Sequence, residues 1–293
     1  MTIPAFINPT AGNADDARKA LSGIPGVEIR ETGAASLADE IRSAVERGAH
    51  RIIVAGGDGT VATAASIIAG TEVSLAILPA GTLNHLAKDL GIPTDLRAAA
   101  ELAVSGVITT IDLGRAGERI FVNTSSLGAY VLFVRTRERL ERMLPYWLAS
   151  LTASLRIMFR LRRIRVEMEA DAQRSTFATP LVFVGVGERE LKLPRLGGRV
   201  EGGQRGLHVI VVQTRGAARL MAVGLEAVAR GLTSVSRGPA VDAFLVDRCR
   251  IELPVATARI AVDGEVVEAH GTLEYSLWRD ALKVVVPAAA DRG

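Results

Sequence analysis

The chain of 293 residues has one cysteine, Cys249, few aromatic residues (4%) and no run of eighteen apolar residues. A single cysteine excludes an internal disulfide, a Cys/His zinc cluster and a redox pair, which fits a reducing cytoplasm. Without a long apolar run or a basic signal-like start, we expect neither a membrane span nor export by that route. The net charge of +3 is small and identifies no partner, and we expect no nucleic-acid binding.

What the chain does contain is enough apolar sequence for a packed protein of two domains: 48% of its residues are hydrophobic and 23% are charged. In the first hundred residues, short apolar runs alternate with segments of helical period, and Ser36 is expected to cap one helix. The expected strands are 3–8, 27–31, 52–55 and 75–78, and the expected helices are 14–21, 37–47, 61–69, 84–90 and 95–105. This alternation predicts an open, mostly parallel α/β layer with helices on both faces.

From Val107 onward strand-like runs follow one another without helices between them, which predicts a mainly antiparallel, sandwich-like second domain. We place the domains at 1–116 and 117–281, closely packed with a cleft between them. The expected strands are 107–113, 120–125, 164–170, 177–186, 207–213, 243–253, 259–262 and 283–286, and the interrupting helices are 136–161 and 217–230.

The most informative stretch is Ile52-Ile53-Val54-Ala55-Gly56-Gly57-Asp58-Gly59-Thr60, an apolar strand that ends in glycines with one carboxylate among them. Glycines permit positive φ and close approach of a ligand, and the start of a helix offers free N–H groups to phosphate. Asp58 would repel phosphate unless a divalent cation lay between the two, so the turn indicates a metal-nucleotide. The alternative is a turn that merely needs room.

A second turn of the same kind follows the strand at 75–78, in Pro79-Ala80-Gly81-Thr82-Leu83-Asn84-His85. Successive parallel strands end at the same edge of a sheet, so we expect both turns to lie together there. His85 could contact a substrate or cap the helix. A polar turn at Asn8-Pro9-Thr10 follows the first strand, and its residues alone favour an ordinary turn.

Together, these motifs resemble the diacylglycerol kinase catalytic-domain family, with the soluble bacterial lipid kinases as the nearest group and sphingosine and ceramide kinases as relatives. The resemblance rests on 56–60 and 78–93 and continues through 121–128, 196–199 and 262–265. It implies an α/β domain like those of phosphofructokinase and NAD kinase, a β-sandwich domain that binds lipid, and a last strand, 282–288, that returns to the first domain. It further implies transfer of the γ-phosphoryl group of ATP to a lipid hydroxyl.

The resemblance also implies roles for particular residues. Glu265 would be the general base, and Asp58 would act in catalysis and hold Mg²⁺. From the residues alone, Asp263-Gly264 reads more readily as an ordinary hairpin turn. The residues expected at the nucleotide are Asn8, Pro9, Thr10, Thr32, Gly56, Gly57, Asp58, Gly59, Thr60, Gly81, Thr82 and Asn84.

Three departures from the family pattern keep alternatives open. Ala62-Thr63 stands where many members have Asn-Glu, Arg205 stands where an acidic residue holds a second Mg²⁺, and 185–188 replaces an Asn-rich segment. We therefore expect no second metal. The alternatives are an NAD kinase, which shares the GGDGT turn, and a nucleotide- or lipid-binding protein with little or no turnover.

A basic helix end could rest transiently on an anionic membrane surface, which would place a cytoplasmic protein at the inner face of the membrane. Its residues are Arg156, Arg160, Arg162, Arg163 and Arg165, with Trp147 and Phe159 nearby. A solvated helix end is the alternative explanation. The scattered His50, His208 and His270 have no metal-ligand spacing and are expected to be structural. A homodimer is left open.

Overall fold

The computed structural model describes residues 2–128, 164–170, 173–189, 198–200, 202–212 and 241–288, together with residues 131, 136 and 152. The chain forms two compact units, Met1–Leu113 with Trp278–Gly293, and Gly114–Leu277. The expected helices at 136–161 and 217–230, and with them Arg156, Arg160, Arg162 and Arg163, lie outside the described residues. Arg165 was wrongly assigned to a helix end, because it lies in a strand, β8.

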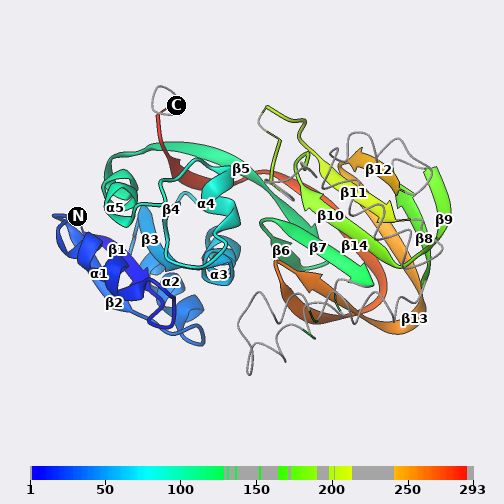
Figure 1. Cartoon of the computed structure of the whole chain (residues 1–293), viewed down its shortest axis with the longest axis horizontal. Helices are drawn as coiled ribbons and strands as arrows, with labels where there is room; N and C mark the ends of the chain where they lie inside the picture. The colour runs from blue at the N-terminus through cyan, green and yellow to red at the C-terminus, as the bar shows by residue number, and fades with distance from the viewer. Residues whose placement is uncertain are drawn as a thin grey trace. The chain divides into compact units, whose positions relative to one another are not determined.

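The first unit is built on parallel strands in the order β2-β1-β3-β4-β14, with β5 paired to β14 (Figure 1). The strands are β1 Ile3–Ile7, β2 Val27–Glu31, β3 Arg51–Gly56, β4 Ser74–Pro79, β5 Val107–Ala116 and the end of β14 Glu265–Val286. The helices are α1 Ala14–Ser22, α2 Leu37–Glu46, α3 Asp58–Ile68, α4 His85–Asp89 and α5 Leu96–Ser105. The prediction of an open, mostly parallel α/β layer is confirmed.

The strand order explains why the central strands are so apolar. All of β4 and all of β3 except Arg51 are buried, as expected for parallel strands covered on both faces. The chain passes from β1 outward to β2 and then back past β1 to β3. With right-handed connections, this reversal sends α1 and α2 to opposite faces, so the carboxyl ends of β1 and β3 form the topological switch point where α/β sheets bind ligands.

The second unit is antiparallel. Its strands follow the order β12-β11-β10-β7-β13-β14, and β8 joins β13 to β9 (Figure 1). A single buried apolar cluster includes side chains from most of these strands, among them Phe121, Val184, Ile251 and Tyr275. The strands are β6 Arg119–Phe121, β7 Thr124–Gly128, β8 Ile164–Ala170, β9 Gln173–Thr179, β10 Leu181–Val186, β11 Leu207–Val212, β12 Val241–Val246, β13 Arg248–Val262 and β14.

Several expected strand boundaries were wrong. The run 177–186 is two strands, since Pro180 has no N–H for a ladder and separates β9 from β10. The run 243–253 divides at Asp247 between β12 and β13. Conversely, 253–262 continues β13, and β14 runs from Glu265 to Val286 although its middle carries many charged residues. Charge hides a strand from a hydrophobic pattern when that strand has an exposed face.

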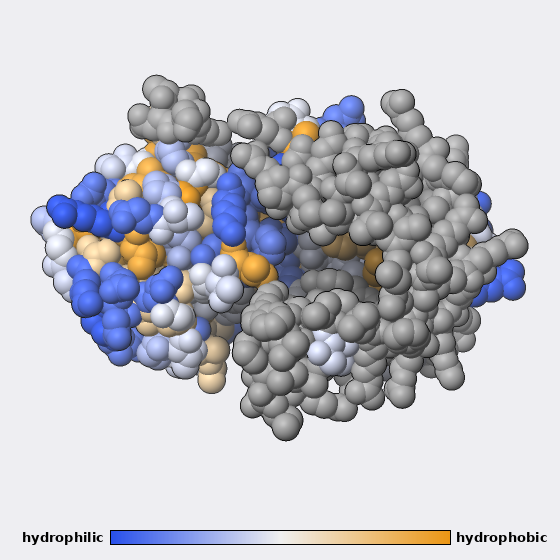
Figure 2. Space-filling view, viewed as in Figure 1, coloured by the Kyte–Doolittle hydropathy of each residue, from blue (hydrophilic) through white to orange (hydrophobic). Residues whose placement is uncertain are grey.

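The helix starts in the first unit also needed correction. Helix α3 begins at Asp58 rather than Val61, so Asp58 belongs to the helix. Ser36 precedes α2 but makes no side-chain capping bond to it. Among the described residues, no helix is both long and apolar enough to cross a membrane. On the face drawn in Figure 2, polar residues of the first unit alternate with small apolar patches.

Candidate functional site

The turns after β3 and β4 are packed backbone to backbone. A Cβ on Gly81 would lie 2.3 Å from the Gly57 Cα and 3.0 Å from its nitrogen, so no other residue fits there without a shift. The Ala80 N–H donates to the Gly56 carbonyl over 3.2 Å. The expectation that both glycine turns share one edge of the sheet is met by this direct contact.

The glycines provide space rather than unusual dihedral angles. Gly56, Gly57, Gly59 and Gly81 do not have positive φ, so these turns do not use the positive φ that glycine permits. At Gly56 a Cβ would come within 2.6 Å of the Thr60 side chain, because the first turn of α3 folds back over the strand end. Close packing at the start of α3 therefore explains the glycine at position 56.

The Asp58 carboxylate joins the two turns. Its Oδ1 accepts the backbone N–H of His85 over 2.7 Å, so the first residue of α3 holds the first residue of α4. Asn84, in the left-handed region at φ 51, makes this approach possible. Its side chain accepts from the Gly81 nitrogen at 3.1 Å and donates to the Gly81 carbonyl at 2.7 Å. The side chain of His85 is exposed.

The turn after β1 is tied to the same place through Asn8. Its Oδ1 accepts from the backbone nitrogen and the hydroxyl of Thr10, at 3.0 and 2.8 Å, and its Nδ2 donates to the Thr60 hydroxyl at 3.3 Å. The Asn13 N–H reaches the Ala80 carbonyl at 3.2 Å. The bond from Asn8 to Thr60 therefore spans the switch point between β1 and β3.

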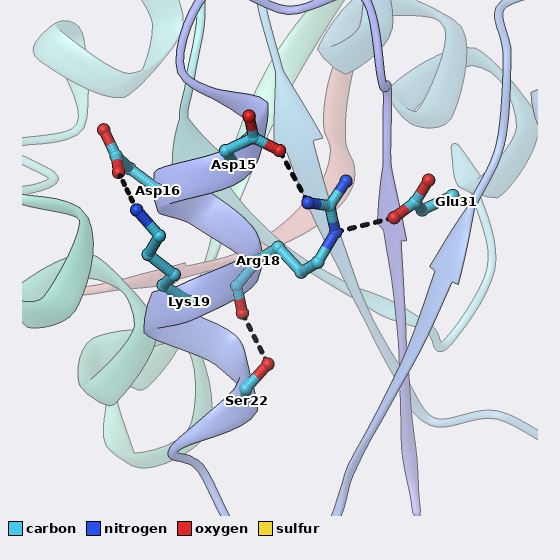
Figure 3. A network of polar contacts seen from close by, with 6 residues as sticks. All are labelled: Asp15, Asp16, Arg18, Lys19, Ser22 and Glu31. Carbon is cyan, nitrogen blue, oxygen red and sulfur yellow. Dashed lines mark hydrogen bonds and ion pairs between the residues drawn. The ribbon is translucent and has the colours of Figure 1, made fainter.

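Thr32 is buried and directly follows β2, and its backbone N–H donates a hydrogen bond to the Ile7 carbonyl at 2.9 Å. Beside it, Arg18 of α1 lies between Asp15 and Glu31, with both contacts at 2.6 Å, so that α1 is tied to the end of β2 (Figure 3). These exposed ion pairs orient the helix more than they stabilise it. Pro9 and Thr82 are exposed in the turns after β1 and β4.

Glu265 is in the second unit, directly after a two-residue hairpin turn. Val262 pairs with Glu265, and the intervening Asp263 and Gly264 have φ of 45° and 88°, as in the Asp-Gly turns favoured in hairpins. The Glu265 side chain is exposed and makes no hydrogen bond or ion pair to a described residue. It therefore has the accessibility that a general base requires.

Asp263 behaves quite differently from Glu265. Its carboxylate accepts three backbone N–H groups from residues 122–124, at 2.7, 2.8 and 3.0 Å. Burial raises the pKa of Asp263, and these three donors together with the charge of Arg189 oppose the rise. The Asp-Gly pair predicted a hairpin turn, but nothing local in the sequence indicated that Asp263 would bind a distant loop.

Two arginines complete this region and were not anticipated. Arg189 donates to the Asn123 carbonyl at 2.9 Å, and Arg199 donates to the Val122 carbonyl at 3.1 Å. The backbone N–H of Arg189 donates to Nδ1 of His208 over 3.1 Å. His208 thus has a structural role, as its isolated position in the sequence suggested.

The three departures have structural counterparts. Thr63, which replaces a carboxylate, donates its hydroxyl to the Gly59 carbonyl within α3 at 2.9 Å. Glu188 makes two hydrogen bonds to Gln204, in the loop before β11. Its backbone N–H donates to the Gln204 carbonyl at 3.1 Å, and its side-chain carboxylate accepts from the Gln204 backbone N–H at 3.0 Å. Arg205 is exposed just before β11. The absence of a second metal remains a prediction.

Comparison with known proteins identifies the family. Residues 3–116 match the model of the diacylglycerol kinase catalytic domain. Over 263 residues the chain is 31% identical to a probable YegS-like lipid kinase of Pseudomonas aeruginosa, covering 85% of this chain and 81% of the relative. The chain belongs to the diacylglycerol kinase family.

Other members of the diacylglycerol kinase family match over shorter lengths. A diacylglycerol kinase of Mycobacterium tuberculosis is 37% identical over 122 residues, 39% of this chain and 40% of that protein. The match thus spans about two fifths of that relative's length. A crystal structure of a diacylglycerol kinase from Bacillus anthracis shares the fold, with a TM-score of 0.71, 18% identity and coverage of 98% of this chain and 97% of that one.

The contact between the two glycine turns can be tested with Gly81→Ala. The added methyl group must displace Gly57 or the Asn84 side chain, so we expect ATP to bind at least about tenfold more weakly, measured by calorimetry. Gly23→Ala, at the end of α1 where a Cβ would meet nothing closer than 3.8 Å, is the matched control and should bind normally. If both variants bound ATP with equal affinity, nucleotide binding would not depend on the contact between Gly57 and Gly81.

The half-buried His208 predicts a dependence of stability on pH. Burial lowers the pKa of His208 below its ordinary value of about 6.5, so below that pH the unfolded chain binds more protons than the folded one. The free energy of unfolding should therefore fall as the pH is lowered from 7 toward 5. In His208→Asn, whose side-chain oxygen can still accept from Arg189, part of this fall should disappear in denaturant titrations. The exposed His50→Asn serves as the control and should keep the full slope.

Proposed function

We propose that this protein is an ATP-dependent lipid kinase that transfers the γ-phosphoryl group to the hydroxyl of a diacylglycerol-like lipid. The main support for this proposal is that the turns after β1, β3 and β4 contact one another at the switch point of a parallel sheet. The Asp58 carboxylate joins the turns after β3 and β4. We further propose that residues 1–116 bind the nucleotide, that 117–281 bind the lipid, and that strand 282–288 belongs to the first domain.

The first unit offers phosphate the free N–H groups at the start of α3. The first intrahelical bond is donated by Val61 to the Gly57 carbonyl, so the preceding nitrogens of the helix start have no partner within it. The glycines at the strand end keep this approach open, and the helix dipole favours negative charge there. Asn8, Thr10 and Thr60 would contribute side-chain oxygens and nitrogens around the same nucleotide.

The residues present fit one magnesium ion brought in with ATP. Mg²⁺ usually takes one or two carboxylates together with phosphate oxygens and water. Asp58 supplies one carboxylate here, with a single oxygen engaged by His85, and the described part of the chain holds no group of three or more acidic, His or Cys residues arranged to hold a metal ion. When bound, Mg²⁺ would neutralise the negative charge of the phosphates that face Asp58.

Glu265 would act as general base for the lipid hydroxyl. Phosphoryl transfer needs positioning, charge neutralisation and removal of the hydroxyl proton, and an exposed carboxylate without a fixed partner can accept that proton. The proton passes from the hydroxyl to a Glu265 oxygen as the new O–P bond forms and the bond to the β-phosphate oxygen breaks. Contact with a membrane surface and cytoplasmic location remain predictions, as the basic residues 156–163 lie outside the described residues.

A substrate panel separates this proposal from its alternatives. Radiolabelled ATP is offered with diacylglycerol, monoacylglycerol, sphingosine or NAD, and products are separated by chromatography. We expect label in a lipid. Label in NAD alone would indicate an NAD kinase, and ATP binding without any product would indicate a binding protein that does not turn over. Either result would overturn the proposal.

The role of Asp58 predicts the behaviour of Asp58→Asn. The amide oxygen can still accept the His85 N–H, so the turns should stay together while the negative charge is lost. We expect kcat to fall by at least about 100-fold, with an unchanged unfolding midpoint. Asp16→Asn, in the exposed first turn of α1, is the control and should retain full activity. Native turnover in Asp58→Asn would exclude Asp58 from the chemistry.

A further inference from the structure

We propose that Asp263 is a positioning residue that fixes the backbone from which Glu265 extends. This inference rests on the proposed function, since it assigns Glu265 the part of base. Asp263 and Glu265 are two residues apart on the hairpin between β13 and β14, and of their two side chains only that of Asp263 is bonded to another described segment.

The turn itself is not enough to hold Glu265 in place. Both of its central residues lie in the left-handed region, which glycine adopts freely but which costs aspartate up to about 1–2 kcal/mol. An aspartate serving only the turn would bond its own neighbours in the chain. Asp263 instead reaches residues 122–124, far away in sequence.

The contact between Asp263 and this loop engages both carboxylate oxygens and the backbone N–H of the residue. Oδ2 accepts from Val122 at 2.7 Å, Oδ1 accepts from Asn123 at 2.8 Å and from Thr124 at 3.0 Å, and the Asp263 N–H donates to the Thr124 carbonyl at 2.8 Å. Bonds to a charged acceptor are stronger than neutral ones. The hairpin tip is therefore attached at four points to the segment that leads into β7.

The receiving loop is itself held from its other side. Arg199 and Arg189 donate to the carbonyls of Val122 and Asn123, and the Val186 N–H reaches the Asn123 carbonyl at 3.0 Å. Directly after the loop, β7 pairs with β13 through Ser125 and Val262. Asp263 thus attaches the tip to a loop whose backbone is bonded to β10 and to both arginines.

Glu265 depends on this arrangement because its side chain has no described partner that would hold it. Its carboxylate position follows from the backbone at the end of the turn and from its own rotamers. Displacing a catalytic group by about 1 Å can cost about 100-fold in rate. Loosening the tip should therefore lower turnover without changing the nucleotide site in the first unit.

The test compares Asp263→Asn, Glu265→Gln and the double variant. The Asn side chain keeps the shape but turns an N–H₂ group toward one of the backbone donors. We expect kcat to fall about 100-fold in Asp263→Asn with KM for ATP unchanged. In the Glu265→Gln background, Asp263→Asn should cause no further loss, because a residue acting through Glu265 has nothing left to position.

A second substitution covers the case in which Asp263→Asn does not fold. Gly264→Ala strains the turn at φ 88° without a clash, since nothing lies within 4 Å of the added Cβ. It should reproduce the loss of kcat and the absence of further loss in Glu265→Gln. Gly271→Ala, which introduces comparable strain at φ 60° in β14 and also has nothing within 4 Å, is the matched control and should turn over normally.

The outcomes separate the two claims. Full activity of folded Asp263→Asn or Gly264→Ala beside an inactive Glu265→Gln would overturn the positioning role and leave the base assignment standing. Equal losses from Asp263→Asn in both backgrounds would also overturn it, since Asp263 would then act independently. Native activity of Glu265→Gln would overturn the proposed function itself.

Discussion

The close approach of Gly57 and Gly81 is the constraint on which the first unit's site depends. At this separation the Asp58 carboxylate reaches the first N–H of α4, and the Asn84 side chain can bond both ends of its own turn. Asn8 then connects the turn after β1 through Thr60. Any side chain at position 81 would separate two helix starts as well as two loops, so one packing contact sets the positions of the polar groups around it.

Much of this unit could be read from the sequence, because its elements are local. Apolar runs that end in glycine predict buried parallel strands, and two such ends predict one shared edge. The purpose of the glycines was less accessible. From the sequence, a glycine turn suggests positive φ. In the structure, positions 56 and 81 must be glycine because a Cβ there would collide with Thr60 and with Gly57. A contact between two loops cannot be read from either loop alone. The strand order that places Asn8 beside Thr60 at the switch point was equally invisible.

In the second unit, several features could not be predicted from the sequence pattern. Exposed faces carry charge along the middle of β14, so the hydrophobic pattern found only the last residues of a strand that begins at Glu265. The bonds from Asp263 to residues 122–124 join segments about 140 positions apart, and so do not follow from the Asp-Gly pair that predicts the turn. Arg189 and Arg199 bond backbone carbonyls, which carry no side-chain identity and leave no complementary residue in the sequence to search for.

The hydrogen bonds of the three carboxylates distinguish what each can do. Both oxygens of Asp263 accept backbone N–H groups. If the carboxylate took up a proton, the new O–H group would face one of these N–H donors and that hydrogen bond would be lost. Asp263 therefore suits a structural role. Asp58 has one oxygen bonded to His85, which orients the carboxylate, and its other oxygen accepts nothing from the described residues. That suits a ligand for a cation. Glu265 has both oxygens available and is exposed, as proton transfer requires, but for the same reason it cannot orient itself. A base without a partner of its own needs a backbone that is held in place, and this is the role that we propose for Asp263 beside Glu265.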